Sequence, residues 1–410
     1  MKIFVPFPYY YPEQCAGLSI IDDILRTCTE EGIEAQLYVP TPTRNVPKDA
    51  KWEIDEMQEN GLLKIHRFKM YGEGRNPIFR AVRYLLNECV YLYALLRYDY
   101  DIVFLDSTPP IQGLKLPILK LFRKKPVLHN AQDIFPESLV GAGLAGKGGI
   151  LWHIGNIISK ITYHFSDKIV VISDGFKKTL TEKGVPADKI EVIYNWVDET
   201  KVIPIKKNDN PLYDEFGLDP TKFRIVYAGN LGHAQNLDVI LAAADRLKDR
   251  HDIEFVIFGS GGLEADIKKT IKDKQLANVG MFPLQPSDRV SFVYGLGDLC
   301  IVSCKKGFGG SALPSKTWSI LSAGRPVLAN FDDGELRYIL ESNGCGIFTN
   351  ADDVNAMVNA ISRLSENISE CNEMGRRGRK FIETKLRKDM NTSRYRDVIK
   401  QLVNKTNSLH

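Results

Sequence analysis

Short apolar runs typical of buried strands alternate with amphipathic helical segments along almost the whole chain. Between residues 237 and 247, for example, apolar side chains recur at the i, i+3, i+4 spacing of a helix that buries one face: Leu237, Ile240, Leu241, Ala244 and Leu247. Alternating strands and helices form parallel sheets that helices cover on both sides, so the sequence predicts an α/β protein. The strand-like runs are 3–5, 35–39, 63–68, 102–105, 127–129, 168–172 and 191–193 in the first half, and 224–227, 254–258, 299–303, 327–329 and 346–348 in the second.

A chain of 410 residues is too long for one ordinary core, so we expect two doubly wound, Rossmann-like domains that face each other across a cleft. The polar stretch 204–211 interrupts the alternation, and a new strand begins soon after it. This predicts an N-terminal domain over 1–203, a linker over 204–222 and a C-terminal domain over 223–385. A last helix, over 386–410, is expected to pack back on the N-terminal domain.

Charge and cysteine content exclude several classes of protein. A net charge of +3 argues against general nucleic-acid binding. Seven cysteines without regular spacing argue against a disulfide framework and favour a reducing cytoplasm. Cys300 and Cys304 lie on an expected strand, where four residues span roughly 13 Å, so they indicate core positions rather than a metal pair. No apolar run reaches the length of a membrane-spanning helix, and the N-terminus predicts a first strand rather than a signal peptide.

A glycine-rich stretch between an expected buried strand and a helix beginning at Ser315 is the strongest ligand signal. Gly307, Gly309 and Gly310 remove side chains where a ligand could approach the backbone. Ser315 is a favourable N-cap, the free N–H groups after it form an anion site, and Lys316 adds a positive charge. These features predict phosphate binding. The alternative is a strand–loop–helix connection without a ligand.

Two further strand–helix loops expose glycines and donors at what should be the same sheet edge. The residues are Gly229, Asn230, Gly232, His233 and Gln235 after one strand, and Gly259, Ser260 and Gly261 after the next. Three such loops of one domain together indicate a site for a nucleotide diphosphate. His233 alone indicates a polar donor or a plain surface residue rather than a metal ligand.

The first domain carries polar groups after two of its strands. Gly17, near the start of a helix, would let a substrate touch the backbone. Gln132, Asp133 and Glu137 follow the strand 127–129 and combine an amide with two carboxylates. Asp133, facing the cleft, could hold or deprotonate a sugar hydroxyl. The alternative is that Asp133 and Ser138 merely cap turns.

These segments resemble the retaining glycosyltransferases of family 4, which have the GT-B fold, and the resemblance covers nearly the whole chain. The segments that match in order and spacing are 132–138, 193–198, 227–237, 258–261 and 314–327. Within the family, the chain is most similar to the N-acetylfucosamine-type transferases of O-antigen and capsule assembly. Those proteins share the Asp-x-aromatic-Pro-Glu-Ser and Pro-Ser-Lys signatures.

The chain departs from the family pattern at several charged positions. Where the family has an arginine, a lysine, two glutamates and a histidine, this chain has Asn230, Gln235, Ser311, Ser319 and Gln132. The arginine and lysine normally neutralise the donor diphosphate. In this chain we expect Lys316, the N-terminus of its helix and His233 to neutralise the donor diphosphate instead.

The resemblance implies transfer of a sugar, of the N-acetylated amino or deoxyamino kind, from a nucleotide-diphosphate donor linked to UDP. The acceptor would be a lipid-linked glycan or another saccharide in bacterial surface polysaccharide biosynthesis, the anomeric configuration would be retained, and no metal would be obligatory. The C-terminal domain would bind the nucleotide sugar and the N-terminal domain the acceptor. Because the leaving group is a nucleotide diphosphate, the catalyst mainly stabilises phosphate charge and positions the acceptor.

Other functions compete with this interpretation. A GT-B-fold nucleotide-sugar epimerase would use similar phosphate loops but needs several carboxylates and a histidine that converge in the cleft. A non-catalytic nucleotide-sugar-binding module would need no acceptor apparatus, which Asp133 and Glu137 supply here. A dehydrogenase is disfavoured because no G-x-G-x-x-G follows the N-terminal strand.

Basic residues among apolar ones in the first domain predict peripheral contact with the cytoplasmic face of the inner membrane. The segment 77–97 mixes aromatic and aliphatic residues with Arg80, Arg83 and Arg97. The segment 114–125 adds five more cations, Lys115, Lys120, Arg123, Lys124 and Lys125. Such a combination suits anionic lipid. The alternative is that these helices bury one face on the sheet and the cations line the solvent side.

Overall fold

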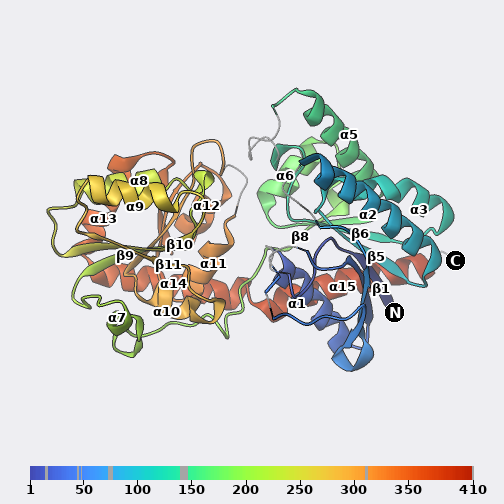
Figure 1. The fold of residues 1–410 in the computed structure, drawn as a ribbon, viewed down its shortest axis with the longest axis horizontal. Coiled ribbons are helices and arrows are strands. Elements are labelled where there is room, and N and C mark those ends of the chain that lie inside the picture. Colours follow the sequence, from blue (N-terminus) through green and yellow to red (C-terminus); the bar gives the residue numbers. More distant parts are fainter. Residues whose placement is uncertain are drawn as a thin grey trace. The chain divides into compact units, whose positions relative to one another are not determined.

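The computed structural model describes residues 1–13, 17–43, 46–47, 49–72, 77–138, 146–309 and 313–408, and of residues 77 and 78 it describes the backbone only. The chain forms two compact units (Figure 1). Met1–Tyr194 and Asp389–His410 make up the first, and Asn195–Lys388 make up the second.

The first unit is built on an eight-stranded sheet. Its strands are β1 (Lys2–Pro6), β2 (Glu34–Pro40), β3 (Asp55–Gln58), β4 (Leu63–Phe68), β5 (Ile102–Asp106), β6 (Val127–Ala131), β7 (Lys168–Val171) and β8 (Ile190–Val192). They run in the order β3-β4-β2-β1-β5-β6-β7-β8, and neighbours are parallel except for β3 with β4. The carboxyl ends of β5 and β6 therefore lie side by side.

Helices cover both faces of this sheet. They are α1 (Leu18–Glu30), α2 (Pro77–Arg97), α3 (Leu116–Phe122), α5 (Ile150–Phe165), α6 (Asp174–Glu182) and α15 (Lys388–Asn407), with the 3-10 helices η1 (Glu59–Gly61), η2 (Pro110–Lys115) and η3 (Ala187–Lys189). Val103 and Leu105 of β5 pack in one cluster with α2 and α3, whereas Phe104 contacts the ring of Tyr395 on α15. Because successive side chains of a strand point to opposite faces, α2 and α3 cover one face and α15 the other.

The second unit is built on a six-stranded parallel sheet. Its strands are β9 (Phe223–Asn230), β10 (Ile253–Ser260), β11 (Val279–Pro283), β12 (Leu299–Ser303), β13 (Val327–Phe331) and β14 (Gly346–Asn350), in the order β11-β10-β9-β12-β13-β14. Its helices are α7 (Leu212–Glu215), α8 (Leu237–Arg246), α9 (Glu264–Asp273), α10 (Val290–Gly295), α11 (Ser315–Ser322), α12 (Glu335–Ser342), α13 (Val354–Ser365) and α14 (Ile368–Lys385), with η4 (Lys207–Asp209), η5 (His233–Gln235) and η6 (Ser287–Arg289).

Two Rossmann-like α/β units with parallel sheets confirm the predicted fold class. Every predicted strand is present, with each end within three residues of its expected position. Two strands, β3 and β11, have no clear signal in the sequence: β3 is a short, polar edge strand, and β11 is an edge strand that contains glycine and ends in proline. The apolar face of α8 is buried as predicted, and Cys300 and Cys304 are buried core residues, as predicted.

The chain passes from the first unit to the second at Tyr194–Asn195, upstream of the boundary at residue 203 that the sequence suggests. Residues 204–222, expected as a linker, contain η4 and α7 and belong to the second unit, where Leu212 and Tyr213 are buried. From Asp389 onward, the C-terminal helix belongs to the first unit.

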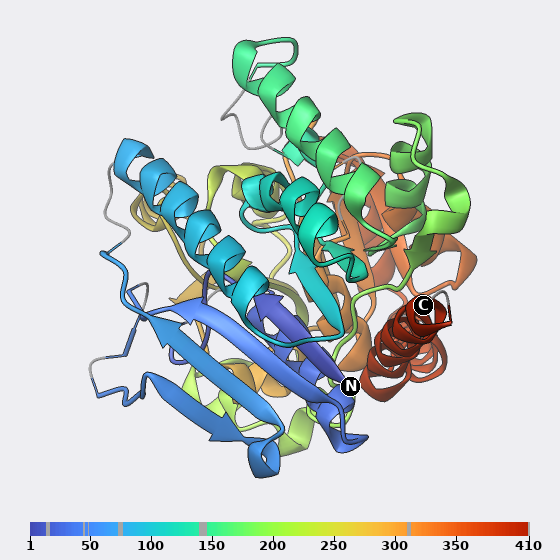
Figure 2. The same cartoon turned by 90° about the vertical axis from the view of Figure 1, so that its right-hand side faces the viewer.

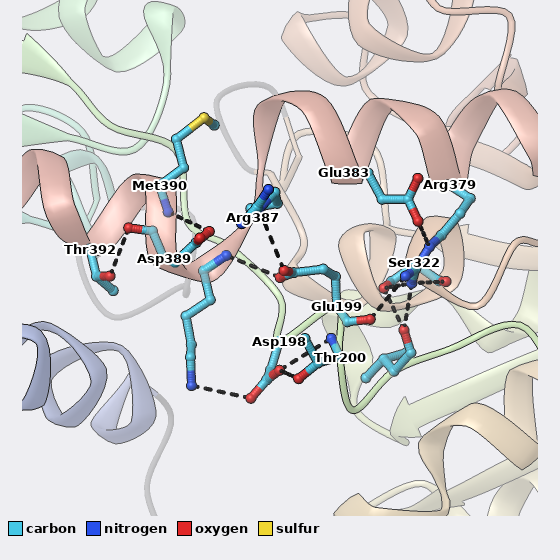
Figure 3. A network of polar contacts seen from close by, with 12 residues as sticks. Asp198, Glu199, Thr200, Ser322, Arg379, Glu383, Arg387, Asp389, Met390 and Thr392 are labelled. Carbon is cyan, nitrogen blue, oxygen red and sulfur yellow. Dashed lines mark hydrogen bonds and ion pairs between the residues drawn. The ribbon is translucent and has the colours of Figure 1, made fainter.

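The guanidinium of Arg379 on α14 holds the segment that opens the second unit (Figure 3). It donates hydrogen bonds to the carbonyl oxygens of Glu199 and Val202 at 3.0 and 2.9 Å, and to the carbonyl and hydroxyl oxygens of Ser322 at 2.9 and 3.0 Å. Close by, Lys388 pairs with Asp198 at 3.2 Å. Although burial opposes ionisation, hydrogen bonds from Thr200 and Lys388 hold the pKa of Asp198 at about 2. The segment 198–202, which opens this unit, is thus attached by polar contacts to α14, to the end of α11 and to the first residue of α15.

We expect Arg379→Ala to lower the free energy of unfolding by about 2–4 kcal/mol, because it removes hydrogen bonds to three partly buried carbonyl oxygens. Arg376→Ala on the same helix is the matched control. Arg376 pairs with Glu373 on the surface, and such pairs contribute about 0–1 kcal/mol. Urea unfolding followed by circular dichroism measures both. Equal stability of the two variants would contradict the assignment.

Candidate functional site

The first two predicted donor loops meet at the carboxyl edge of the second sheet. Gly229 of β9 is in register with Gly259 of β10, and Asn230 with Ser260. A Cβ atom on Gly259 would lie 2.5 Å from the carbonyl oxygen of Gly229 and 2.6 Å from the side chain of Leu231. The absence of a side chain at residue 259 is therefore required for packing between the two loops, whether or not a ligand binds.

Lys316 of α11 reaches the end of β9. Its Nζ lies 3.1 Å from the hydroxyl of Tyr227 and 4.2 Å from the centre of the Tyr227 ring. A Cβ atom on Gly229, where φ is 142°, would lie 2.9 Å from the same Nζ. Glycine at this position thus makes room for the lysine. Burial lowers the pKa of Lys316 to about 8, so its charge is costly unless an anion compensates it.

Tyr227 is a site residue whose role the sequence did not reveal. Its side chain is buried, accepts a hydrogen bond from Lys316 and donates one of 2.7 Å to the carbonyl oxygen of Asn230. The hydroxyl thereby fixes both the cation and the loop after β9. The only signal in the sequence is a tyrosine near the end of an otherwise aliphatic strand, which is also typical of an ordinary core position.

The start of α11 differs from the prediction in one respect. Ser315 is the first helical residue, and Pro314 occupies the N-cap position without a side-chain hydrogen bond. The predicted N-cap role of Ser315 is therefore wrong. The proline holds extended backbone dihedrals before the helix and cannot cap it with a side chain.

The glycine-rich loop before α11 is held by an aspartate. Asp332, just after β13, accepts hydrogen bonds of 2.8 Å from the backbone N–H groups of Gly307 and Gly309. These two groups therefore point to a carboxylate in this structure, and a phosphate would have to displace it. Gly310 and Ser311, also singled out by the sequence, lie outside the described residues.

A cavity of about 300 Å³ lies beside Lys316 in the second unit. Its walls are mostly apolar, from Phe258, Leu284, Val290, Val293 and Tyr294. Gly229, Ser315, Lys316 and Ser319 also line it. An apolar slot with one cation and a few polar groups is typical of small-molecule sites and has the character that a nucleoside with an attached phosphate requires.

Other predicted donor-side residues do not line this cavity. Asn230, His233, Ser260 and Gly261 are exposed, and Gly232 and Gln235 are partly exposed. The backbone oxygen of Gln235 accepts a 2.6 Å hydrogen bond from the Ser303 hydroxyl, which ties this loop to β12. The structure thus brings Gly229, Ser315 and Lys316 together at one cavity and leaves the remaining donors on the neighbouring surface.

In the first unit, the carboxyl ends of β5 and β6 carry a polar cluster. Asp106, His129 and Asp133 line a small cavity of about 20 Å³. Burial raises the pKa of Asp106 to about 7, against hydrogen bonds from neighbouring backbone N–H groups and from Asn130. Burial lowers the pKa of His129 to about 4, so this imidazole is neutral at physiological pH. The surrounding protein also raises the pKa of Asp133, although its side chain is exposed.

Asn130 connects this cluster to Gln132 and to the C-terminal helix. Its Nδ2 donates to Asp106 at 3.0 Å, and its Oδ1 accepts from Gln132 at 2.9 Å and from the Tyr395 hydroxyl at 2.9 Å. Asp106, Asn130 and Tyr395 were not predicted as site residues. Asn130 and Tyr395 lie 265 positions apart in the sequence, so no local pattern pairs them.

Two other predicted residues lie away from this cavity. Glu137 is exposed and forms an ion pair of 2.7 Å with Lys183, so it does not join Asp133 there. Gly17 is the N-cap of α1, with φ of 81°, and no described atom lies within 4 Å of the position a Cβ would take. The contact of Gly17 with a substrate stays a prediction.

We expect Tyr395→Phe to reduce turnover severalfold, because Asn130 would lose one of the groups that fix its amide and Gln132 would lose its fixed acceptor. Tyr91→Phe is the matched control. It also removes a buried hydroxyl, which donates 2.8 Å to the carbonyl oxygen of Phe7. Both variants should lose about 1 kcal/mol of stability, and only Tyr395→Phe should change kcat. If Tyr395→Phe and Tyr91→Phe have equal kcat values, Tyr395 contributes only to packing and stability.

Two features of the described part of the chain bear on cofactors and membranes. No group of three or more His, Cys, Asp or Glu side chains there is arranged to hold a metal ion. Nor does any helix among those residues combine the length and apolarity needed to cross a membrane.

Comparisons with known proteins agree with this geometry. The family described as Glycosyltransferase Family 4 matches residues 19–201, and Glycosyl transferases group 1 matches residues 211–381. The glycosyl transferase WcaI of Escherichia coli (strain K12), assigned to colanic acid biosynthesis, is 30% identical over 341 residues, which cover 79% of this chain and 82% of WcaI. The glycosyltransferase WbjE of Pseudomonas aeruginosa is 27% identical over 272 residues, covering 65% of this chain and 66% of WbjE.

A solved structure of Anabaena Alr3699/HepE in complex with UDP has the same fold, with a TM-score of 0.72 and 11% identity over 98% of this chain and 99% of that chain. The identity to WcaI over most of both proteins, together with the two matched families in their expected order, establishes the relationship. The chain belongs to the group 1 and family 4 glycosyltransferases, which have the GT-B fold.

Proposed function

We propose that this glycosyltransferase moves a sugar from a UDP-linked donor to a lipid-linked saccharide with retention of the anomeric configuration, in polysaccharide biosynthesis. The observation that carries the proposal is Lys316, a partly buried cation beside Gly229 at the edge of an apolar cavity of about 300 Å³. The similarity to WcaI supports a biosynthetic pathway of this kind, and the UDP complex of HepE supports the choice of nucleotide.

The proposed chemistry divides the work between two groups of residues. The bond between the anomeric carbon and the phosphate oxygen breaks, and UDP leaves with the electron pair. Lys316, supported by the amides at the start of α11, offsets the charge that develops on the phosphate. The acceptor oxygen forms the new bond, and its proton passes to the Asp133 carboxylate. Charge stabilisation by a fixed cation would make a divalent metal dispensable.

The proposed donor sugar is N-acetylated, of the amino or deoxyamino kind. This rests on the resemblance of residues 132–138 and 314–316 to the signatures of N-acetylfucosamine-type transferases. The identity of the donor sugar is independent of the proposed reaction type, because a different sugar specificity would leave the phosphate site unchanged.

A transfer assay tests the proposal. The purified chain is incubated with a panel of UDP-linked, dTDP-linked and GDP-linked sugars and a lipid-linked saccharide, with and without EDTA. We expect transfer from an N-acetylated UDP-sugar, equal rates with EDTA, and a product whose anomeric configuration, read by NMR, equals that of the donor. An inverted product, a requirement for metal, or preference for another nucleotide would each contradict one part of the proposal.

An epimerase remains the competing function, because Asp106, His129 and Asp133 converge on one cavity. That cavity, at about 20 Å³, is too small for a sugar nucleotide. Formation of an epimerised nucleotide sugar without an acceptor, in the same assay, would favour the epimerase.

A further inference from the structure

Helix α2 is apolar on the side that faces solvent as well as on the side that faces the sheet. Its inward side packs Tyr91, Ala94 and Leu95 into the core. Its outward side carries a stripe at helical spacing: Phe79, Val82, Leu86, Tyr93 and Leu96 are all exposed. A helix that is apolar all round is typical of burial on every side. The outward stripe therefore requires a covering that the described residues do not provide.

Two neighbouring helices extend this apolar surface. Figure 2 shows α2, α3 and α5 side by side, and α3 contacts both of the others. On α3, Ile118, Leu121 and Phe122 are exposed, with Leu121 at 71%. On α5, the exposed residues include Ile150, at 80%, and Ile154 and Ile157 one turn and two turns further on. We call the exposed side of α2, α3 and α5 the three-helix face.

The charges on the three-helix face have one sign. The sole acidic residue in these three helices is Glu88, which is buried and paired with Lys115 at 2.6 Å. Lys124, Lys147 and Lys160 are exposed on or beside these helices and form no ion pair with a described residue. A surface that combines large apolar side chains with uncompensated cations matches an anionic lipid bilayer.

This charge pattern also argues against a second copy of the chain as the covering. Two three-helix faces in contact would bring lysines together without any carboxylate between them, and like charges at an interface are unfavourable. An acidic headgroup layer instead places negative charge against the lysines and hydrocarbon against the apolar stripe.

We propose that the three-helix face is a membrane-docking surface that inserts its apolar side chains into the interface of anionic lipid. The surface differs from the one expected from the sequence. Arg83 and Lys115, predicted as interfacial cations, are buried, so that part of the prediction is wrong. Lys120 is paired with Asp167, and Arg123 donates to the carbonyl oxygens of Leu96 and Tyr98. The face also includes α5, which the sequence did not indicate.

Vesicle flotation of the full chain tests the proposal. We compare phosphatidylcholine vesicles with vesicles that contain equal parts of phosphatidylcholine and phosphatidylglycerol. The triple variant Leu121→Gln, Ile150→Gln, Ile154→Gln should bind anionic vesicles at least about tenfold more weakly, because each apolar group inserted contributes to binding. The triple variant Lys124→Glu, Lys147→Glu, Lys160→Glu should lose binding by on the order of a hundredfold, since each cation near the surface contributes roughly 1 kcal/mol.

Matched controls replace equally exposed apolar residues elsewhere: Met57→Gln on β3 and Tyr338→Ser on α12 should leave flotation unchanged. UDP binding by calorimetry should be the same in all variants, so failure of docking and failure of the proposed reaction give different results. In the unmodified chain, brominated lipid should quench the fluorescence of Trp152 on α5, and Trp152→Phe should remove that quenching.

Three outcomes would overturn the proposal. Flotation that is equal for parent and both triple variants would exclude the face as the contact. Absence of Trp152 quenching in the unmodified chain would also exclude the face as the contact, and this result does not depend on the folding of any variant. A dimer in light scattering that the apolar triple variant converts to a monomer would assign the face to a second copy of the chain instead.

Discussion

Lys316→Ala is expected to weaken the binding of UDP by about ten- to a hundredfold and to slow transfer, while the unfolding transition stays close to that of the parent. A hydrogen bond between an ammonium group and phosphate contributes roughly 1.5–3 kcal/mol. The ammonium group of Lys316 contacts the hydroxyl and ring of Tyr227 and forms no ion pair with a described residue, so its removal leaves none of the described carboxylates unpaired. Isothermal titration with UDP alone measures the change.

Lys306→Ala is the matched control, because Lys306 is an exposed cation on the preceding loop and does not line the cavity. Its replacement should change UDP affinity by less than about threefold, as expected for a solvent-exposed charge. If Lys316→Ala binds UDP with unchanged affinity, the phosphates bind at another part of the carboxyl edge of this sheet and not beside Lys316.

The same lysine predicts a pH dependence of donor binding. Burial lowers the pKa of Lys316 to about 8, so the group is charged below that pH and neutral above it. UDP affinity should therefore fall as pH rises from 7 to 9.5, a range in which the phosphates, with a second pKa of about 6, are already ionised. In Lys316→Ala this dependence should disappear. Titrations across that range distinguish loss of this charge from a general loss of structure.

The fold could be predicted because each strand carries its own local pattern, whereas most of the site depends on distant contacts. Lys316 and Tyr227 lie 89 positions apart, and their contact exists because β9 and the start of α11 meet at one sheet edge. The carboxylate of Asp332 accepts hydrogen bonds from the N–H groups of Gly307 and Gly309, in the loop where the sequence predicts that a ligand approaches the backbone. No residue type or spacing in the sequence indicates that a carboxylate accepts these hydrogen bonds in place of a phosphate. An aspartate after a strand is also common as an ordinary turn residue.

The helices of the first unit illustrate a second limit. The sequence of α2 is apolar on both sides, so periodicity identifies the helix but not which side faces the sheet. Arg83 lies on the inward side and donates to the Thr43 hydroxyl at 2.7 Å, although an arginine between apolar residues favours the solvent side on average. The direction of a helix face is decided by tertiary packing and became visible only in the structure.

Asp133→Asn is expected to lower kcat by about 10²–10⁴-fold with little change in UDP affinity. Positioned general acids and bases contribute factors of this size. The exposed carboxylate of Asp133 at the carboxyl end of β6 can meet an acceptor hydroxyl, and its pKa is raised by the surrounding protein, which makes it a better base than a fully solvated carboxylate. Asparagine has the same shape and cannot take a proton. An interaction made mainly in the transition state changes turnover and not ground-state binding.

The same substitution separates catalysis from turn capping, because asparagine caps turns and helices as well as aspartate does. A capping role would therefore leave kcat intact in Asp133→Asn and reduce stability in Asp133→Ala. Glu182→Gln, which changes an exposed carboxylate on α6 to an amide, is the control for the loss of one charge. In the parent, kcat should fall as the pH drops through the raised pKa of Asp133, and this acid limb should be absent in Asp133→Asn. Full activity of Asp133→Asn with an authentic acceptor would remove Asp133 from the mechanism and leave the proton to the departing phosphate.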